Sequence, residues 1–136
     1  MTALLCAPRP STRPLLGAER AAVNLQHWQE ARGRIEDPAV ADALRSLEEG
    51  PETRPLLDLI FAYSPFLTDC ALKEMATLPR LFQAGPEAAV EEAIGDLLDK
   101  AAAAERAEAF RLLRVARRRT ALAAGLADIA GTWPLE

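Results

Sequence analysis

Apolar residues recur along this chain at the three- and four-residue spacing that is typical of α-helices. Residues 18–32 show the pattern first, with Ala22, Leu25 and Trp28 on one face and Gly33 at its end. Residues 18–32 are therefore predicted to be a helix that buries this face.

Two further helices are expected in the next thirty residues. Asp37 before Pro38 predicts an N-cap followed by a first helical turn, and Gly50 ends that helix. Residues 52–63 are apolar on most sides, so they are predicted to form a third helix at the centre of the core.

The start of a fourth helix is predicted by Ser64 and Pro65, and its apolar face runs through Met75. The stretch "PRLFQAG" at residues 79–85 follows a Leu-Pro pair and is predicted to be a short turn. A fifth helix opens at Pro86 with an apolar face, formed by Val90, Ile94, Leu97 and Leu98.

The last helix is expected to start near Ala103 and to run to Ala130, where Gly131 ends it. No alternating stretch of useful length predicts a strand. The predicted fold is all-α, with about six helices joined by short Pro/Gly turns in an array or bundle. Residues 1–17, rich in proline, are predicted to be an irregular arm that precedes a helical region at 18–136.

The last helix combines a basic face with an apolar face. At about 100° per residue, one arc carries a core stripe, formed by Ala109, Leu112, Leu113, Ala116, Thr120, Ala123 and Ala127. Arg111, Arg114, Arg117 and Arg118 lie on the opposite arc. The arginines are interpreted either as a solvated helix face or as a surface that docks an acidic partner, and both interpretations stay open.

The second half of this helix is apolar nearly all round. Leu122, Leu126 and Ile129 lie outside the core stripe, and Asp128 is the only charge. A helix of this kind usually enters a larger core, and an isolated charge in it needs a partner. We therefore expect a neighbour beyond the first 109 residues for the apolar side chains, and a partner on another element for Asp128.

Charge and composition narrow the function classes. The net charge of the 136 residues is −4, although residues 105–119 hold six arginines against two glutamates. An acidic chain is unlike a general nucleic-acid binder, so no nucleic-acid partner is expected. Without a signal peptide or a long apolar segment, the chain is expected to be cytoplasmic and free of membrane contact.

No arrangement of side chains predicts catalysis or ligand binding. His27 is the single histidine, Cys6 and Cys70 are interpreted as two reduced thiols, and Ser64 lacks a nucleophile motif. Asp96 and Asp99 lie on a helix rich in acids and are interpreted as solvated. No catalytic, cofactor-binding or metal-binding residue is predicted in this chain, and no cofactor.

Two segments nevertheless carry a resemblance: "SPFLTDCALKEMATLPRLFQAGPEAAVEEAI" at 64–94 and "LLRVARRRTALAAGLADIAGTWPLE" at 112–136. The Arg-Arg-Arg run, Leu-Ala-Asp-Ile-Ala-Gly and the final Trp-Pro-Leu-Glu are the most specific parts. They resemble the N-terminal helical region of the bifunctional glutamine synthetase adenylyltransferase/adenylyl-removing enzyme.

The resemblance implies a large cytosolic enzyme with two nucleotidyltransferase domains. One domain attaches AMP from ATP to a tyrosine of glutamine synthetase, the other removes it by phosphorolysis, and the PII signalling protein and glutamine set the balance. In that family a Gly-Ser motif and an Asp-x-Asp pair bind Mg²⁺, because paired carboxylates hold the metals that neutralise phosphoryl charge. This chain has no Asp-x-Asp, so no catalytic residue is transferred to it and the chain alone is expected to be inactive.

Two functional hypotheses follow. In the first, the chain is a fragment: the N-terminal helical scaffold of such an enzyme, preceding a nucleotidyltransferase domain that would contact the docking face Arg111, Arg114, Arg117, Arg118 and Asp128. In the second, the chain is a stand-alone helical module that docks an acidic partner through the same arginines. An independent enzyme would need a catalytic arrangement that the sequence does not contain.

Overall fold

The computed structural model describes residues 17–131, and within this range the fold is all-α, as predicted. The seven α-helices and one short 3₁₀ helix are α1 (Ala18–Gly33), α2 (Pro38–Glu49), α3 (Arg54–Tyr63), α4 (Pro65–Lys73), η1 (Met75–Thr77), α5 (Leu78–Ala84), α6 (Pro86–Ala101) and α7 (Arg106–Ala130). The predicted arm and the Trp-Pro-Leu-Glu motif lie outside the described residues, apart from Gly17.

The predicted helix starts are confirmed where a side chain caps the backbone. The Asp37 carboxylate accepts a hydrogen bond from the Ala39 amide at 2.9 Å, and the Ser64 hydroxyl accepts one from the Leu67 amide at 3.1 Å. Gly131 ends α7 with a φ of 71°, a left-handed conformation that glycine adopts without strain.

The predicted turn at 79–85 is wrong, because residues 78–84 form helix α5. Pro79 occupies the first turn of this helix, where a missing amide hydrogen costs nothing. Leu78, Leu81 and Phe82 are spaced at i, i+3 and i+4, and all three are buried. The boundaries of two other helices also differ: α3 begins at Arg54 and α7 at Arg106, each a few residues later than expected.

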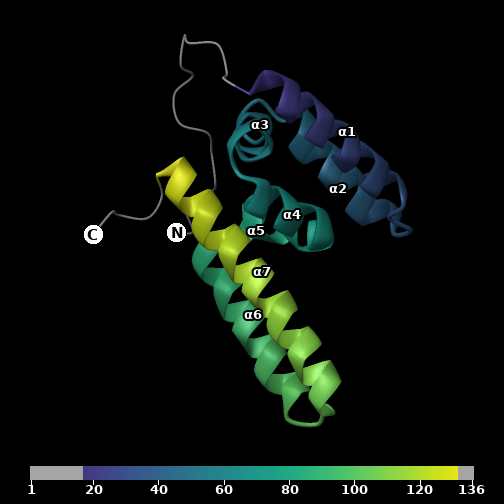
Figure 1. Ribbon diagram of the computed structural model, residues 1–136, viewed down its shortest axis with the longest axis vertical. Helices are drawn as coiled ribbons and strands as arrows, with labels where there is room; N and C mark the ends of the chain where they lie inside the picture. Colours follow the sequence, from purple (N-terminus) through teal and green to yellow (C-terminus); the bar gives the residue numbers. More distant parts are fainter. Residues whose placement is uncertain (1–16, 132–136) are drawn as a thin grey trace.

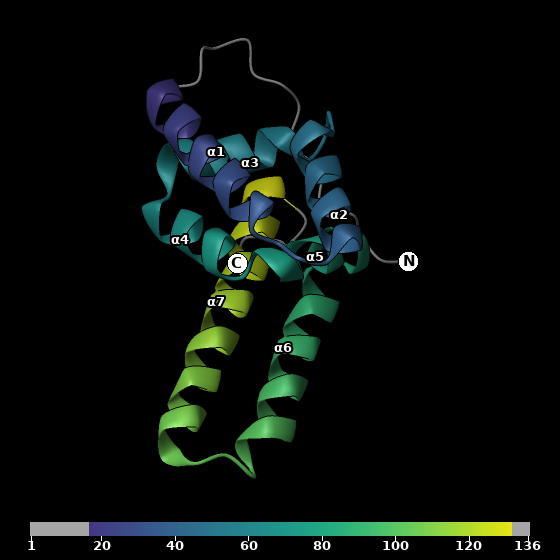
Figure 2. The same ribbon diagram turned by 90° about the vertical axis from the view of Figure 1, so that its right-hand side faces the viewer.

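Helices α1 to α5 pack around an apolar core, whereas α6 and α7 run side by side as an antiparallel hairpin that extends away from them (Figure 1). The view in Figure 2 shows both arms of this hairpin below the other helices. At the centre of the core, the rings of Trp28 on α1 and Phe61 on α3 lie 6.0 Å apart between centroids. The apolar third helix is central, as predicted.

The second half of α7 leaves the hairpin and packs against α3 and α4. Leu122 and Leu126 are both 0% exposed, and Ile129 is partly buried against the same core. The expectation that these side chains lack a neighbour within the chain is therefore wrong for Leu122 and Leu126. Gly125 allows the close approach to α4, because a Cβ at this position would lie 2.7 Å from the Leu67 Cδ1.

Candidate interaction surface on the α6–α7 hairpin

Small and apolar side chains hold the two arms of the hairpin together. Ala93 of α6 and Leu112 and Ala116 of α7 are buried between the arms. Residues 102–105 connect the arms at the far end. Because the arms pack along one stripe only, the hairpin has two long sides, and these sides differ in chemistry.

One side is closed by an ion pair. The Arg119 guanidinium lies 2.8 Å from the Asp96 carboxylate, which joins the arms across the side that Lys100 also lines. The hydrogen bond from Arg119 lowers the pKa of Asp96 below its usual value. Asp96 is half exposed, which agrees with the solvated acid expected from the sequence, and its carboxylate also bonds to the facing helix.

At the root of the hairpin, two more ion pairs connect it to the helices before it. Arg118 lies 2.8 Å from Glu74, at the end of α4, and Arg80 of α5 lies 2.7 Å from Glu92 of α6. Arg80, Thr77 and Arg119 also line a small pocket of about 210 Å³. Both arginines of this pocket already have carboxylate partners, so the pocket offers no free cation to an anionic ligand.

The five residues of the predicted docking face have different environments. Arg111 forms an exposed pair with Glu108 at 2.6 Å, and Arg118 is turned toward Glu74. Arg114 and Arg117 are exposed, and neither forms an ion pair within residues 17–131. Asp128 is exposed and likewise has no ion pair in that range, so its expected partner is not found there.

The other side of the hairpin is an open apolar groove of about 490 Å³. We define the α6–α7 groove by six of its lining residues: Ile94, Leu97, Leu113, Arg117, Ala121 and Ala124. Ile94 is 47% exposed and Leu113 is 50% exposed. The sequence placed Leu113 in the core stripe, and this is wrong, since the stripe is wider than the surface that α6 covers.

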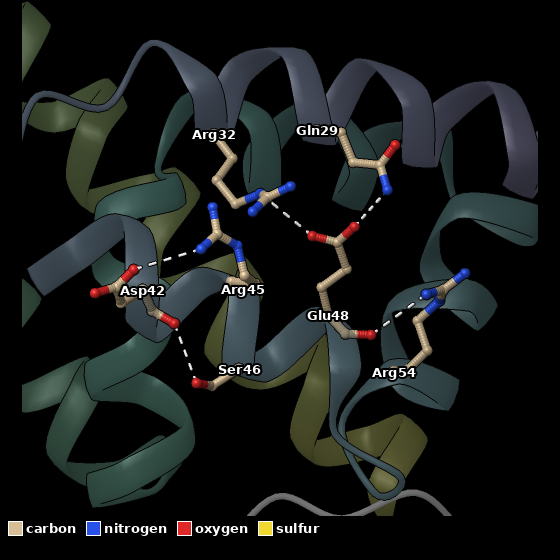
Figure 3. Close-up of polar contacts among 7 residues, drawn as sticks. All are labelled: Gln29, Arg32, Asp42, Arg45, Ser46, Glu48 and Arg54. Carbon is tan, nitrogen blue, oxygen red and sulfur yellow. Dashed lines mark hydrogen bonds and ion pairs between the residues drawn. The ribbon is translucent and has the colours of Figure 1, made fainter. Parts of the chain in front are cut away.

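A second polar cluster lies among α1, α2 and α3 (Figure 3). The Glu48 carboxylate accepts a hydrogen bond from Gln29 and lies 3.2 Å from the Arg32 guanidinium, and Arg54 donates to the Glu48 carbonyl at 3.3 Å. Glu48 is buried and Arg32 is mostly covered. The cluster joins three helices through contacts of a buried carboxylate, so we interpret its role as structural.

The described residues contain no group of three histidine, cysteine or acidic side chains that could hold a metal ion. His27 is exposed on α1. Cys70 is buried, and burial raises the pKa of its thiol. Within residues 17–131, no helix is long and apolar enough to cross a membrane.

Comparison with known proteins confirms the resemblance. The chain is 36% identical over 103 residues to the bifunctional glutamine synthetase adenylyltransferase/adenylyl-removing enzyme of Bradyrhizobium diazoefficiens, which covers 73% of this chain and 10% of that enzyme. The enzyme of the same name from Xanthobacter autotrophicus is 33% identical over 123 residues, 90% of this chain and 12% of the relative. For the Rhodopseudomonas palustris enzyme the identity is 34% over 127 residues, 85% of this chain and 12% of the relative.

No protein-family model matches the chain, and no solved structure matches it. The chain spans about a tenth of the length of the curated relatives it matches. Over most of its length, then, this chain is similar to a small part of the bifunctional glutamine synthetase adenylyltransferase/adenylyl-removing enzymes.

Proposed function

We propose that this chain works as a non-catalytic helical scaffold of a cytoplasmic enzyme that attaches adenylyl groups to glutamine synthetase and removes them, in control of nitrogen assimilation. The observation that carries the proposal is the similarity to these bifunctional enzymes, which extends over 73% to 90% of the chain. The nucleotidyltransferase domain that this scaffold contacts supplies the chemistry, with ATP and Mg²⁺, and acts on glutamine synthetase under the influence of PII.

The exposed arginines support a docking role for this scaffold. Arg114 and Arg117 are exposed on the same helix, one turn apart, and form no ion pair with residues 17–131. Two such cations attract an acidic surface and orient its approach. We therefore assign the contact with the nucleotidyltransferase domain to this part of α7.

A chimera tests the proposal. The matching 103-residue segment of the Bradyrhizobium diazoefficiens enzyme is replaced by the part of the present chain that aligns with it, and release of ADP from adenylylated glutamine synthetase in the presence of inorganic phosphate is measured. We expect the chimera to keep activity and the R114E/R117E version to lose at least about tenfold, because two attractive contacts become repulsive. R34E, on an exposed arginine of α1's C-terminal end, serves as the control.

Two results would contradict the scaffold function. A folded chimera that neither attaches nor removes the adenylyl group of glutamine synthetase would show that the chain cannot replace the segment it resembles. Release of AMP or ADP from adenylylated glutamine synthetase by the purified 136-residue chain would show that the chain is catalytic by itself.

The alternative, a stand-alone module that docks an acidic partner, is favoured by one observation. Leu122 and Leu126 are fully buried by helices of the described range, so the core is closed around α7 without help from another domain. A self-sufficient module melts cooperatively and stays monodisperse, and calorimetry with light scattering measures both. Aggregation of the purified chain at low concentration would contradict this alternative.

A further inference from the structure

The α6–α7 groove is an open apolar surface that no helix of residues 17–131 covers. Ile94 and Leu113 line it from opposite arms, and the 67% exposed Leu98 extends it along α6. Three large apolar side chains in water at neighbouring positions are unfavourable for a monomer and mark a binding site.

The two sides of the hairpin show that the exposure of this groove is not a general property of the helix pair. The opposite side is crossed by the pair between Arg119 and Asp96 and is narrow, whereas the α6–α7 groove is wide and almost entirely apolar. Two antiparallel helices with one open apolar side form two thirds of a three-helix bundle. A third amphipathic helix in the groove would bury Ile94, Leu98 and Leu113 together.

The charged residues beside the groove indicate which charges a bound helix should carry. Arg117 lines the groove, and Arg114 lies one turn before it, also exposed. Arg111, Arg118 and Arg119 each pair with a carboxylate of the chain. Arg114 and Arg117, in contrast, form no ion pair with residues 17–131 and are available to a partner. On α6, Glu91 lies three positions before the groove residue Ile94 and is exposed, so its charge disfavours further carboxylates on that flank.

We propose that the α6–α7 groove binds an amphipathic α-helix of another polypeptide segment, with carboxylates along the flank that faces Arg114 and Arg117 and no carboxylates along the flank that faces α6. The inference shares Arg114 and Arg117 with the docking contact of the proposed function, but the groove itself belongs entirely to this hairpin. The two experiments can fail separately: an inactive chimera would not exclude peptide binding to the groove, and absence of peptide binding would not exclude an active chimera.

Two synthetic peptides test the inference on the full chain. Both are 18-residue helices with leucines at i, i+3, i+4 and i+7 spacing; one carries glutamates along a single flank and the other glutamines at the same positions. Fluorescence anisotropy of the labelled peptides measures their dissociation constants. We expect the glutamate peptide to bind about fivefold more tightly, the gain of two exposed ion pairs.

Variants of the chain locate the contact. I94E and L113E should each abolish binding of both peptides, while V23E, at an equally exposed apolar residue of α1, should leave binding unchanged. The R114Q/R117Q variant should bind both peptides with equal affinity. Because all of these positions are exposed, the variants are expected to fold, and circular dichroism verifies this.

Three outcomes would overturn the proposal. The first is no binding of either peptide, and the second is a glutamate preference that survives in R114Q/R117Q. The third is a dimer of the chain in sedimentation equilibrium that L113E dissociates, which would identify a second copy of the chain as the occupant of the groove.

Discussion

The guanidinium of Arg118 lies 2.8 Å from the carboxylate of Glu74, and this pair connects α7 to the end of α4 across 44 positions of sequence. The side chains are 22% and 10% exposed, respectively. The pair therefore lies mostly out of water at the point where the hairpin meets the other helices. An arginine that belongs to a basic face in the sequence is thus a tertiary contact in the fold.

Removing one partner of this pair should destabilise the fold. R118A leaves the Glu74 carboxylate largely buried without its cation, and we expect a loss of about 1–3 kcal/mol in the free energy of unfolding. Urea denaturation followed by circular dichroism measures the loss. R111A, which breaks an exposed pair, should keep nearly the stability of the original chain. Equal losses in the two variants would contradict the tertiary role of Arg118.

Removing the buried Glu48 carboxylate among α1, α2 and α3 should lower the free energy of unfolding even more. E48A removes the partner of Arg32 and of Gln29 at once, so we expect a loss of about 2–4 kcal/mol. The matched control on the same helix is D42A, whose pair with Arg45 is largely exposed and should contribute little. If E48A melts at the temperature of D42A, the cluster does not join these helices.

Replacing Gly95 and Gly125, which both lie inside helices, by alanine should have opposite effects on stability. G95A on α6 places a Cβ with nothing within 4 Å and should stabilise the chain by about 0.5–1 kcal/mol, since alanine has the higher helix propensity. G125A on α7 gains the same propensity, but its Cβ would lie 2.7 Å from Leu67. The displacement of Leu67 should cancel the gain or reverse it. Thermal melts compare the two variants, and a clear stabilisation by G125A would contradict the close contact between α4 and α7.

The Asp96–Arg119 pair should be visible in a pH titration. Because Arg119 lowers the pKa of the folded carboxyl, the pair stabilises the fold above the unfolded pKa, near 3.8, and this contribution is lost as the pH falls through the lower folded value. Carboxyl-carbon NMR should therefore find Asp96 below 3.8, and R119Q should move it back. Since Asp96 is half exposed, added salt should reduce the shift. A pKa of Asp96 that R119Q leaves unchanged would contradict the pair.

Periodicity and capping residues predict most of the fold. The helix starts at Asp37 and Ser64 are predictable because each side chain caps a backbone amide only two or three positions further along the chain. The helix at 78–84 is missed because Pro79 resembles a breaker unless its position in the first turn is known. Exposure is harder to predict. The helical wheel places Leu113 in the core stripe and Leu122 outside it, yet Leu122 is buried and Leu113 is exposed. The path of α7 past α3 and α4 decides this, and the wheel does not contain it.

The candidate surface is predicted only in part, because the partners of its arginines depend on tertiary packing. The sequence identifies the arginines of the last helix, but the carboxylates that occupy Arg118 and Arg119 come from η1's start and from α6. These partners lie 44 and 23 positions away, so no local pattern contains them. Glu48 is missed likewise, since its burial depends on the packing of α1 against α2.

Helix α7 is continuous over 25 residues, yet its two halves have different surroundings. The first half lies along α6, while the second half contributes Leu122, Ala123, Leu126 and Ala127 to the core. Amides near Arg111 can therefore exchange with solvent through a local opening of the hairpin, whereas amides near Leu122 require the whole fold to open. A single continuous helix is thus expected to show two levels of amide protection, low toward residues 102–105 and high beside the core.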